Sequence, residues 1–363
     1  MNILVVNCGS SSLKFQLIDS ETEQVSASGN CERIGLDGKI TYKAHGDKFV
    51  TETDLPEHGI AIKKVLELLV DKERGVINSL DEIHAVGHRM VHGGEKFSSS
   101  VVITEDVIKD IESCNDLAPL HNPANLIGVE ACEKLMPGTP MVAVFDTAFH
   151  QTMPAKAYLY GLPKEYYEKY GVRRYGFHGT SHSFVSKRLA ELAGLDYNNS
   201  KMIVCHIGSG ASISAIKDGK SIDTSMGMTP LEGLVMGTRS GDIDPAIIEF
   251  ICQKENISVS EMTTILNKKS GVLGLSGVSN DFRDLVDARE SGNKDAANAL
   301  DVLVYRIVKY IGAYYMALGG VDAIALTAGA GENNKEVREM IMEGISALGV
   351  KTVSYTHLRA HET

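Results

Sequence analysis

ILVVNCGSSSLKFQLID, residues 3–19, is the stretch that decides the fold. An apolar run rich in β-branched residues breaks into Asn-Cys-Gly and three serines, and a run of alternating polarity follows. This pattern predicts a strand, a tight polar turn and a returning strand. Glycine lets a backbone approach a ligand closely, and the serine hydroxyls and turn amides offer donors beside Lys14. The turn therefore suits phosphate, although glycine and serine also dominate ordinary turns for local reasons.

The same pattern occurs a second time. Residues 202–218, MIVCHIGSGASISAIKD, align without a gap with residues 3–19 and pair Gly208 with Gly9. A third glycine-rich turn, at 327–333, follows a short apolar run and precedes a helical pattern. Two copies of one motif indicate a duplicated domain. The three turns together favour a nucleotide bound between two domains.

Eight separated blocks resemble, in order and spacing, the motifs of the acetate kinase family: NCGSSSLKF, GHRMVHGGEKF, LAPLHNPAN, PMVAVFDTAFHQTMP, RRYGFHGTSH, MTPLEGLVMGTRSGDIDPA, NKKSGVLGLSGVSNDFRD and TAGAGEN. The resemblance covers residues 1 to about 351. It implies an α/β fold of duplicated ribonuclease-H-like domains with an interdomain cleft, as in the actin, sugar-kinase and heat-shock-ATPase superfamily. It also implies reversible phosphoryl transfer from ATP to acetate, giving acetyl phosphate and ADP.

Length and composition fit this interpretation. At 363 residues with 43% hydrophobic side chains, the chain is long enough for two cores. We predict an N-terminal domain at 1–150, a helical connection at 151–200, a nucleotide-binding domain at 201–351 and a tail outside the family at 352–363. The formal charge of −11 argues against a nucleic-acid partner.

The chain carries no sign of export or of a membrane anchor. Its six cysteines are scattered without a C-x-x-C pair, which is typical of buried thiols in a reducing compartment. No signal peptide and no apolar run of ~20 residues is present. We therefore expect a soluble cytoplasmic protein.

Periodicity predicts the remaining elements of the first half. Further strands are expected at 24–34, 83–91 and 141–145, and helices at 58–70, from Thr104, and from Pro123 toward Leu135. Arg89 and Asp146 then lie at strand ends, where ligands gather in doubly wound sheets.

In the second half, Thr180 or Ser181 is expected to cap a helix that Gly194 ends. A third strand is expected at 220–226, and a helix from Pro245. The apolar stripe at 300–318 predicts a helix buried in a core or a subunit interface. Further expected elements are a strand at 322–327 and a helix at 334–348, with Gly349 as its C′ residue.

Three charged residues are candidates for phosphoryl transfer, which needs positioned reactants and cations around the moving charge. Arg89 and Arg239 each offer a planar guanidinium that can bind a carboxylate or a phosphoryl oxygen with two hydrogen bonds. The alternative is that both form surface salt bridges. Asp146 is a candidate metal-shell carboxylate, base or turn residue. We favour an electrostatic role linked to Mg²⁺, because acetate is already an anion and no proton need be removed from it.

His178 and His182 are spaced as zinc ligands on one helix would be, but Gly179 and a cap at Thr180 argue against a continuous helix. By resemblance, His178 instead steadies the transition state. By resemblance too, Asn7 is linked to the metal, although an asparagine in a turn needs no such role. The implied cofactor is Mg²⁺, with Mn²⁺ as an alternative.

The resemblance also implies the binding residues. Those for ATP are Lys14, His206, Ile207, Gly208, Ser209, Gly210, Asp281, Phe282, Arg283, Gly329, Ala330, Gly331, Glu332 and Asn333. Phe282 and Arg283 are expected to bracket the adenosine. The family has asparagine where this chain has Ser209, and the shorter hydroxyl with its single donor predicts weaker ATP binding.

The acetate methyl group is expected to be sheltered by Val91, Leu120, Phe177 and Pro230. Propionate and butyrate are alternative substrates, because an apolar pocket discriminates each methylene by only ~1 to 3 kcal/mol. A nucleotide-binding protein that has lost turnover is a second alternative. The family is dimeric, so a homodimer is expected.

The last expectation concerns the end of the chain. Residues 352–363 show no helix or strand pattern and no likeness to the family, whose members continue through a strand, a metal-linked glutamate and a final helix. A family glutamate that helps to hold Mg²⁺ is then missing, which predicts an incomplete second domain and weak activity.

Overall fold

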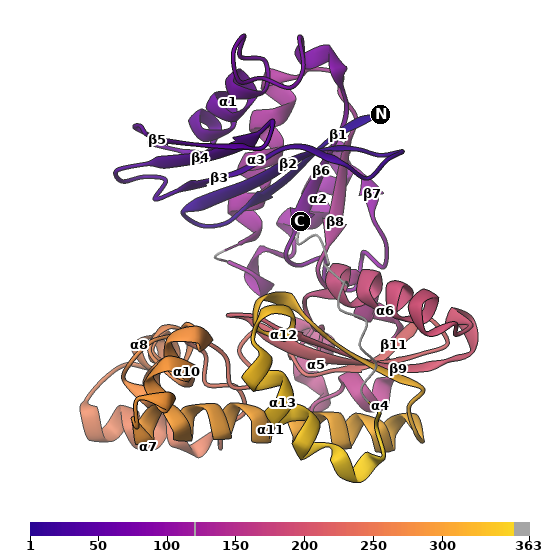
Figure 1. The fold of residues 1–363 in the computed structure, drawn as a ribbon, viewed down its shortest axis with the longest axis vertical. Helices are drawn as coiled ribbons and strands as arrows, with labels where there is room; N and C mark the ends of the chain where they lie inside the picture. The colour runs from indigo at the N-terminus through magenta and orange to yellow at the C-terminus, as the bar shows by residue number, and fades with distance from the viewer. Residues whose placement is uncertain (120, 352–363) are drawn as a thin grey trace. The chain divides into compact units, whose positions relative to one another are not determined.

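The computed structural model describes residues 1–119 and 121–351. Contacts between residues divide the chain into two compact units, Met1–Ala148 and a second unit that begins at Phe149. Residues 151–200, predicted as a connecting segment, lie in the second unit. Each unit contains a mixed sheet with helices packed against it, so the predicted α/β class is confirmed (Figure 1).

The sheet of the first unit is built around the predicted hairpin. Across the described residues its strand order is β5-β4-β3-β2-β1-β6-β8-β7. Strands β1 and β2 pair antiparallel, and β6 runs parallel to β1. The hairpin of β4 and β5 and the short β7 were not predicted. The strands are β1 (Asn2–Cys8), β2 (Ser12–Asp19), β3 (Val25–Glu32), β4 (Lys39–Ala44), β5 (Asp47–Glu52), β6 (Ile83–Met90), β7 (Val101–Val102) and β8 (Met141–Phe145).

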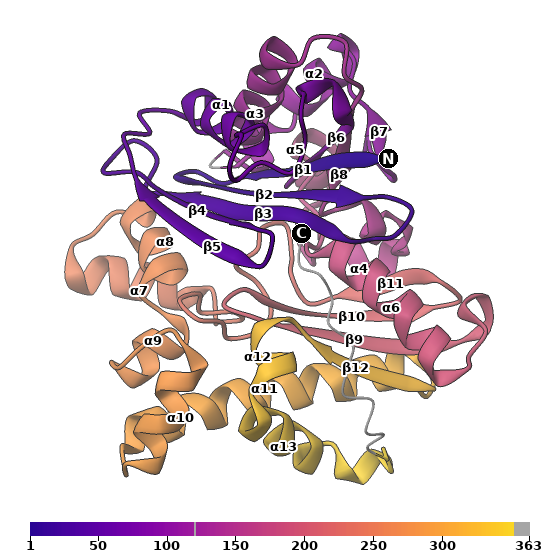
Figure 2. The same ribbon diagram turned by 45° about the horizontal axis from the view of Figure 1, so that its top comes forward.

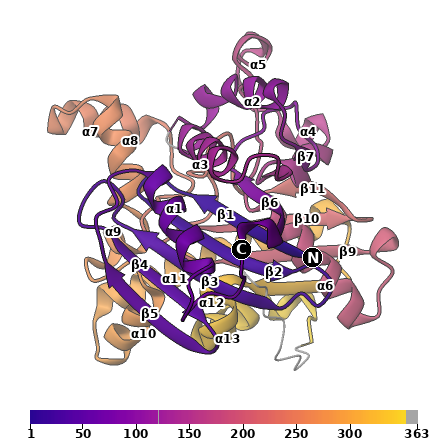
Figure 3. The same cartoon turned by 90° about the horizontal axis from the view of Figure 1, so that it is seen from above.

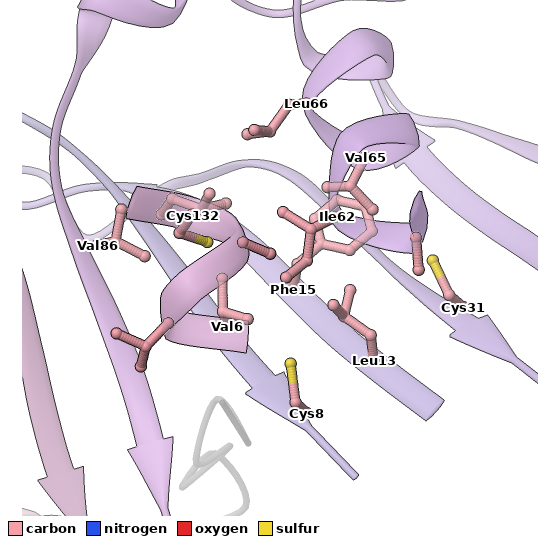
Figure 4. Close-up of a cluster of buried hydrophobic side chains, with 14 of the residues drawn as sticks. Val6, Cys8, Leu13, Phe15, Cys31, Ile62, Val65, Leu66, Val86 and Cys132 are labelled. Carbon is pink, nitrogen blue, oxygen red and sulfur yellow. The ribbon is translucent and has the colours of Figure 1, made fainter. Parts of the chain in front are cut away.

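Helices α1 (His58–Leu69) and α3 (Asn122–Leu135) cover one face of this sheet (Figure 3). Alternate residues of β1 and β2, among them Val6 and Phe15, pack with Ile62 and Val65 of α1 (Figure 4). Helix α2 (Glu105–Glu112) begins as predicted, because the Thr104 hydroxyl accepts a hydrogen bond from the Val107 amide. The remaining alternate residues, which include Asn7, are left on the opposite face of the sheet.

The second unit repeats the centre of this sheet. Its strands are β9 (Lys201–Ile207), β10 (Ala211–Lys217), β11 (Lys220–Thr224) and β12 (Ala323–Thr327), in the order β11-β10-β9-β12 within the described part. Strand β12 runs parallel to β9, as β6 does to β1. The order therefore matches β3-β2-β1-β6, which confirms the duplication inferred from the repeated motif.

Helices cover both faces of the second sheet (Figure 2). Helix α6 (Gly179–Ala193) packs on alternate residues of β9, whereas α11 (Lys294–Leu318) contacts β10 and β9. Most of the apolar stripe at 300–318 is fully buried, so this helix belongs to the core. The other helices are α4 (Ala155–Tyr158), α5 (Lys164–Tyr170), α7 (Ala246–Glu255), α8 (Val259–Lys268), α9 (Gly271–Ser276), α10 (Phe282–Glu290), α12 (Ala328–Asn333) and α13 (Lys335–Gly344).

The gapless alignment of the two hairpins is wrong along the returning strands. Cys8 faces Leu13 in the first hairpin, whereas Ile207 faces Ala211 in the second, so the second tip is one residue shorter. Opposite Asn7 lies Lys14, and opposite the equivalent His206 lies Ser212. A shift of one residue turns every side chain to the other face of a sheet. The sequence did not reveal it because both faces of β10 are buried, so its serines and apolar residues do not mark an exposed and a covered face.

Three local predictions are also corrected. Helix α6 begins at Gly179, with His178 as its N-cap residue, so Thr180 and Ser181 are not the cap. The glycine-rich residues after β12 form the short helix α12 rather than an open turn. Helix α13 ends at Gly344, and Gly349 ends a following 3₁₀ turn instead, because the chain tightens at Ser346–Leu348.

Candidate functional site

The first unit gathers Asn7, Arg89 and Asp146 at the ends of three neighbouring strands. Arg89 Nε donates to Asp146 Oδ1 at 2.9 Å, and a second guanidinium nitrogen donates to Oδ2. Arg89 Nη1 donates to Asn7 Oδ1 at 3.1 Å. The carboxylate is 4% exposed, and its charge raises the pKa of Arg89. The structure thus brings three predicted residues together: Arg89 and Asp146 form an ion pair, and Asn7 accepts a hydrogen bond from the same guanidinium.

Three polar residues for which the sequence analysis predicted no role hold these strand ends in place. Asn125 accepts from the Val91 amide and donates to the Cys8 carbonyl, so it joins the last residue of β1 to the first residue after β6. The Asn122 side chain accepts from the His92 amide and donates to the His92 carbonyl. The Thr147 hydroxyl accepts from the Gly93 amide. Asn122, Asn125 and Thr147 are at most 2% exposed. Two of them lie in the LAPLHNPAN block, where an Asn-x-x-Asn spacing on one helix face was the available signal.

Lys14 lies beside this cluster. It faces Asn7 across the β1–β2 ladder, and directly opposed residues project from the same side of a sheet. The exposed ammonium therefore stands on the polar face that carries Arg89. This places a nucleotide-binding candidate and a substrate-binding candidate in one unit.

The second unit carries a cluster of imidazoles around His178. Its ring stacks on His206 with centroids 4.2 Å apart, and its Nδ1 lies 2.9 Å from Ser212 Oγ. His182 Nε2 lies 2.7 Å from the same hydroxyl, and Ser181 Oγ lies 2.8 Å from His206 Nδ1. His182 is fully buried, and burial holds its pKa well below the usual value, so the ring is neutral.

His178 is held in an unusual backbone conformation. Its φ of 57° lies in the left-handed region, which non-glycine residues seldom adopt. His150 Nε2 donates to the Phe177 carbonyl at 3.0 Å and so fixes the peptide that precedes His178. Gly176, with φ of 75°, leaves no room for a side chain, because a Cβ there would lie 2.2 Å from a Thr224 methyl group. The sequence analysis predicted no role for His150, because no local pattern indicates a contact with a residue 27 positions away.

Gly210 shows where the imidazole and a guanidinium converge. A Cβ placed on Gly210 would lie 3.6 Å from His178 Nε2 and 3.4 Å from Arg239 Nη1. The two predicted catalytic side chains of this unit therefore border one point beside the glycine tip. Backbone at Gly208 approaches Ala328 of α12 there as well.

The Arg239 loop is fixed by backbone contacts. Arg239 Nη1 donates to the Pro230 carbonyl at 3.4 Å, and the Gly237 amide donates to the Ser209 carbonyl at 2.9 Å. Gly271 presses on this loop with φ of 64°, and a Cβ there would lie 2.2 Å from the Met236 carbonyl oxygen. The loop thereby ties Arg239 to the hairpin tip.

The predicted adenosine bracket stays a prediction, and its two residues differ in exposure. The Phe282 ring is 6% exposed and packs within the protein, because it faces inward from the first turn of α10. Asp281 caps α10 by accepting from the Arg283 amide, and it also pairs with the exposed Arg283 guanidinium. Arg283 alone of the pair offers an open face.

At the start of α12, the Glu332 side chain folds back onto the first residues of the helix. Its carboxylate accepts from the Thr327 hydroxyl at 2.8 Å and from the Ala328 amide at 3.2 Å. Asn333 Nδ2 donates back to the Gly329 carbonyl at 3.0 Å. Ala330 and Gly331 are buried. The role in phosphate binding predicted for 329–333 stays a prediction, and Gly329 and Asn333 are the exposed residues of this segment.

The predicted acetate pocket stays a prediction. Val91 is buried in the first unit, Phe177 is buried and Pro230 half-buried in the second, and Leu120 lies outside the described residues. In residues 1–119 and 121–351, no group of three or more His, Cys, Asp or Glu side chains is placed to hold a metal ion. Nor does any helix in these ranges have the length and apolar character needed to cross a membrane.

The profile of the Acetokinase family matches residues 2–362. The chain belongs to the acetokinase family. The acetate kinase of Lachnoclostridium phytofermentans is 66% identical over 351 residues, which make up 96% of this chain and 89% of the relative. The acetate kinase of Agathobacter rectalis is 65% identical over 97% of this chain and 89% of its own length.

Two solved structures of the family superpose closely on this fold. The crystal structure of Porphyromonas gingivalis acetate kinase has a TM-score of 0.93 at 52% identity, covering 96% of this chain and 88% of the other. A propionate kinase from Francisella tularensis has a TM-score of 0.91 at 43% identity, with the same coverage. The resemblance drawn from the eight sequence blocks is thereby confirmed.

Proposed function

We propose that this chain transfers a phosphoryl group reversibly between ATP and acetate, with acetyl phosphate and ADP as the other pair. Family membership supports a kinase, and the 66% identical relative is named an acetate kinase. The observation that carries the proposal is the convergence of His178 and Arg239 on one point beside Gly210.

The chemistry explains why such a convergence suits phosphoryl transfer. Charge spreads over the equatorial oxygens of the moving group, so catalysis depends on positioned donors rather than covalent help. Arg239 supplies a permanent cation, and His178 supplies an imidazole nitrogen on the same side of Gly210. Glycines at 208 and 210 let backbone amides approach the nucleotide phosphates.

In the first unit, we assign Arg89 to the carboxylate of acetate. Three of the five guanidinium N–H groups donate to Asp146 and Asn7, which leaves two for a ligand. Asp146 fixes the orientation of the guanidinium. A base is unnecessary, because acetate is ionised at neutral pH.

Asp146 and Asn7 also fit a role toward Mg²⁺. They supply one carboxylate and one amide oxygen, the hard ligands that this ion prefers, and Mg²⁺ in kinases usually keeps waters and substrate phosphates as its other ligands. A dedicated cage of several acidic residues is therefore not required. Bound with the nucleotide, Mg²⁺ would offset phosphate charge, and Mn²⁺ has the same oxygen preference.

Trapping acetyl phosphate tests the proposal. With ATP, Mg²⁺ and hydroxylamine, acetate should give acetohydroxamate, and omission of acetate or chelation of the metal should abolish it. Propionate and butyrate in parallel measure the substrate preference, which the similarity to a propionate kinase makes worth resolving. Binding of ADP without hydroxamate from any of the three acids would reduce the chain to a nucleotide-binding protein.

A further inference from the structure

Ser212 lies between two histidines in the second unit. Its hydroxyl is 2.9 Å from His178 Nδ1 and 2.7 Å from His182 Nε2, and the serine is fully buried. A hydroxyl has one hydrogen and two lone pairs, and the two ring nitrogens are the partners that the described residues give Ser212 Oγ. If the hydroxyl accepted from both rings, its own hydrogen would be buried without an acceptor, so it donates to one ring and accepts from the other. The direction of these two hydrogen bonds decides which nitrogen of His178 carries a hydrogen.

His182 determines the direction. Its Nδ1 is buried and has no hydrogen-bond partner among the described residues, and burial keeps the ring neutral. A neutral imidazole has one N–H, and a buried N–H without an acceptor is rarer than an acceptor without a donor. The hydrogen of His182 therefore resides on Nε2 and is donated to Ser212 Oγ. Ser212 must then donate to His178 Nδ1.

We propose that His182 and Ser212 act as positioning residues that hold His178 in the tautomer with its hydrogen on Nε2, the nitrogen beside Gly210. In this form His178 donates a hydrogen bond to a phosphoryl oxygen while it remains neutral. The opposite tautomer would present a lone pair to that oxygen and repel it. This inference rests on the proposed function only for its effect on rate, because the tautomer itself is a property of the free protein.

The cluster around His178 contains other titratable groups. His206 stacks on its ring from β9, His182 approaches from α6, and the Arg239 guanidinium borders the same side of Gly210. His150 packs edge-on against His182 from the preceding segment. These neighbours are unchanged by substitutions at Ser212, so a difference between Ser212 variants reports on the hydroxyl.

Ring ¹⁵N spectra of the free wild-type protein test the tautomer directly. Expected is a protonated Nε2 and an unprotonated Nδ1 for His178, and a protonated Nε2 for His182, with signals assigned from the variants His178→Asn and His182→Gln. A protonated Nδ1 at His178 would overturn the proposal, whatever the enzyme's activity.

Kinetics test its consequence. Ser212→Ala should lower kcat about 2- to 10-fold with little change in the KM for acetate, the range that corresponds to one hydrogen bond. The ratio of wild-type to variant kcat should approach one as the pH falls through the imidazole range, because protonation restores a hydrogen to Nε2 whatever the tautomer. Ser212→Thr keeps the hydroxyl and should retain the wild-type pH dependence.

Ser214→Ala is the matched control, since it removes a second fully buried hydroxyl from β10. Equal losses for the two alanine variants, or a ratio that does not change with pH, would overturn the positioning role. If Ser212→Ala does not fold, the wild-type spectra still decide the tautomer. Absence of acetohydroxamate together with the expected spectra would contradict the proposed function but not the tautomer proposed for His178.

Discussion

At the tip end of β1, the first unit places Lys14 and Arg89 on either side of Asn7, whereas at the same place on β9 the second unit places Ser212 and Thr327 on either side of His206. The ladders are the same, but two cations have been replaced by two hydroxyls. In the first unit a buried carboxylate accompanies the charge. In the second, imidazoles and hydroxyls surround His178, and the guanidinium of Arg239 beside it comes from a loop outside the ladders.

The difference teaches how a duplicated fold divides two tasks. A strand-borne arginine locked to a carboxylate is rigid and suits an anion of fixed geometry such as a carboxylate. A cluster of imidazoles and hydroxyls without a carboxylate does not compete with an incoming phosphate for the Arg239 cation, so that one arginine can meet the charge of the moving phosphoryl group. Four predictions follow from this comparison of the two units.

The largest expected effect is that of Arg239→Ala. Removing one preorganised charge at a phosphoryl transition state should lower kcat by about 10² to 10³, or on the order of 3 to 4 kcal/mol, with a small change in melting temperature. Hydroxamate formation and thermal unfolding measure the two. Arg188→Ala, at an exposed arginine of α6 that pairs with Glu191, is the control and should change neither. Activity within tenfold of wild type would remove Arg239 from the mechanism.

The second effect is one of pH and stability, at His88 of β6. His88 faces Val6 as Leu326 faces Cys205 in the other copy, so His88→Leu gives the first unit the residue of the second. Burial lowers the pKa of His88 to about 4, and its Nε2 has no hydrogen-bond partner in the described ranges. In the unfolded chain the pKa is about 6.5. Below pH 6.5 the unfolded state therefore binds a proton that the folded state does not, and stability falls as the pH drops toward 4.

This histidine should contribute about 3 kcal/mol to the loss of stability between pH 7 and pH 4. His88→Leu should remove that part, as urea unfolding followed by circular dichroism at both pH values would show. His182 stays in the variant as a second buried neutral histidine, so some acid sensitivity remains. An unchanged difference between the two pH values would mean that His88 is protonated in the folded protein.

How far the sequence could anticipate this site depends on the residue. The hairpin, the strand ends at Arg89 and Asp146 and the cap at Thr104 follow from local patterns, because one face of the first sheet is covered and polarity alternates along it. The register of β10 does not follow, since both of its faces are buried. Asn125, His150 and Ser212 act through partners at least 27 positions away, and no local pattern encodes such contacts.

The third effect concerns the ion pair itself. Arg89→Gln leaves Asp146 buried without its cation, which should lower stability by about 1 to 3 kcal/mol, less than for a fully buried pair because the arginine side chain is 33% exposed. Adding Asp146→Asn should recover part of that loss, as thermal unfolding of the double variant would show. Thr327→Val, at the equivalent place in the second copy, removes one hydroxyl bond to Glu332 and should cost less. A larger loss at Thr327 would reverse the contrast between the units.

The smallest effect is expected at Ser209, where the family has asparagine. Ser209 lies at the tip of the second hairpin, and Ser10 lies at the tip of the first. The amide of Ser209→Asn adds reach and a second donor hydrogen, and Gly237, which has no side chain, leaves it room: a Cβ there would lie 2.9 Å from the present hydroxyl. One additional hydrogen bond to phosphate should lower the KM for ATP about 2- to 10-fold and leave kcat within about twofold.

Ser10→Asn is the matched control. If the nucleotide is held by the tip of the second hairpin, only the Ser209 variant should change the KM for ATP, whereas an equal response from Ser10→Asn would show that both tips meet the nucleotide and that the division between the copies is incomplete.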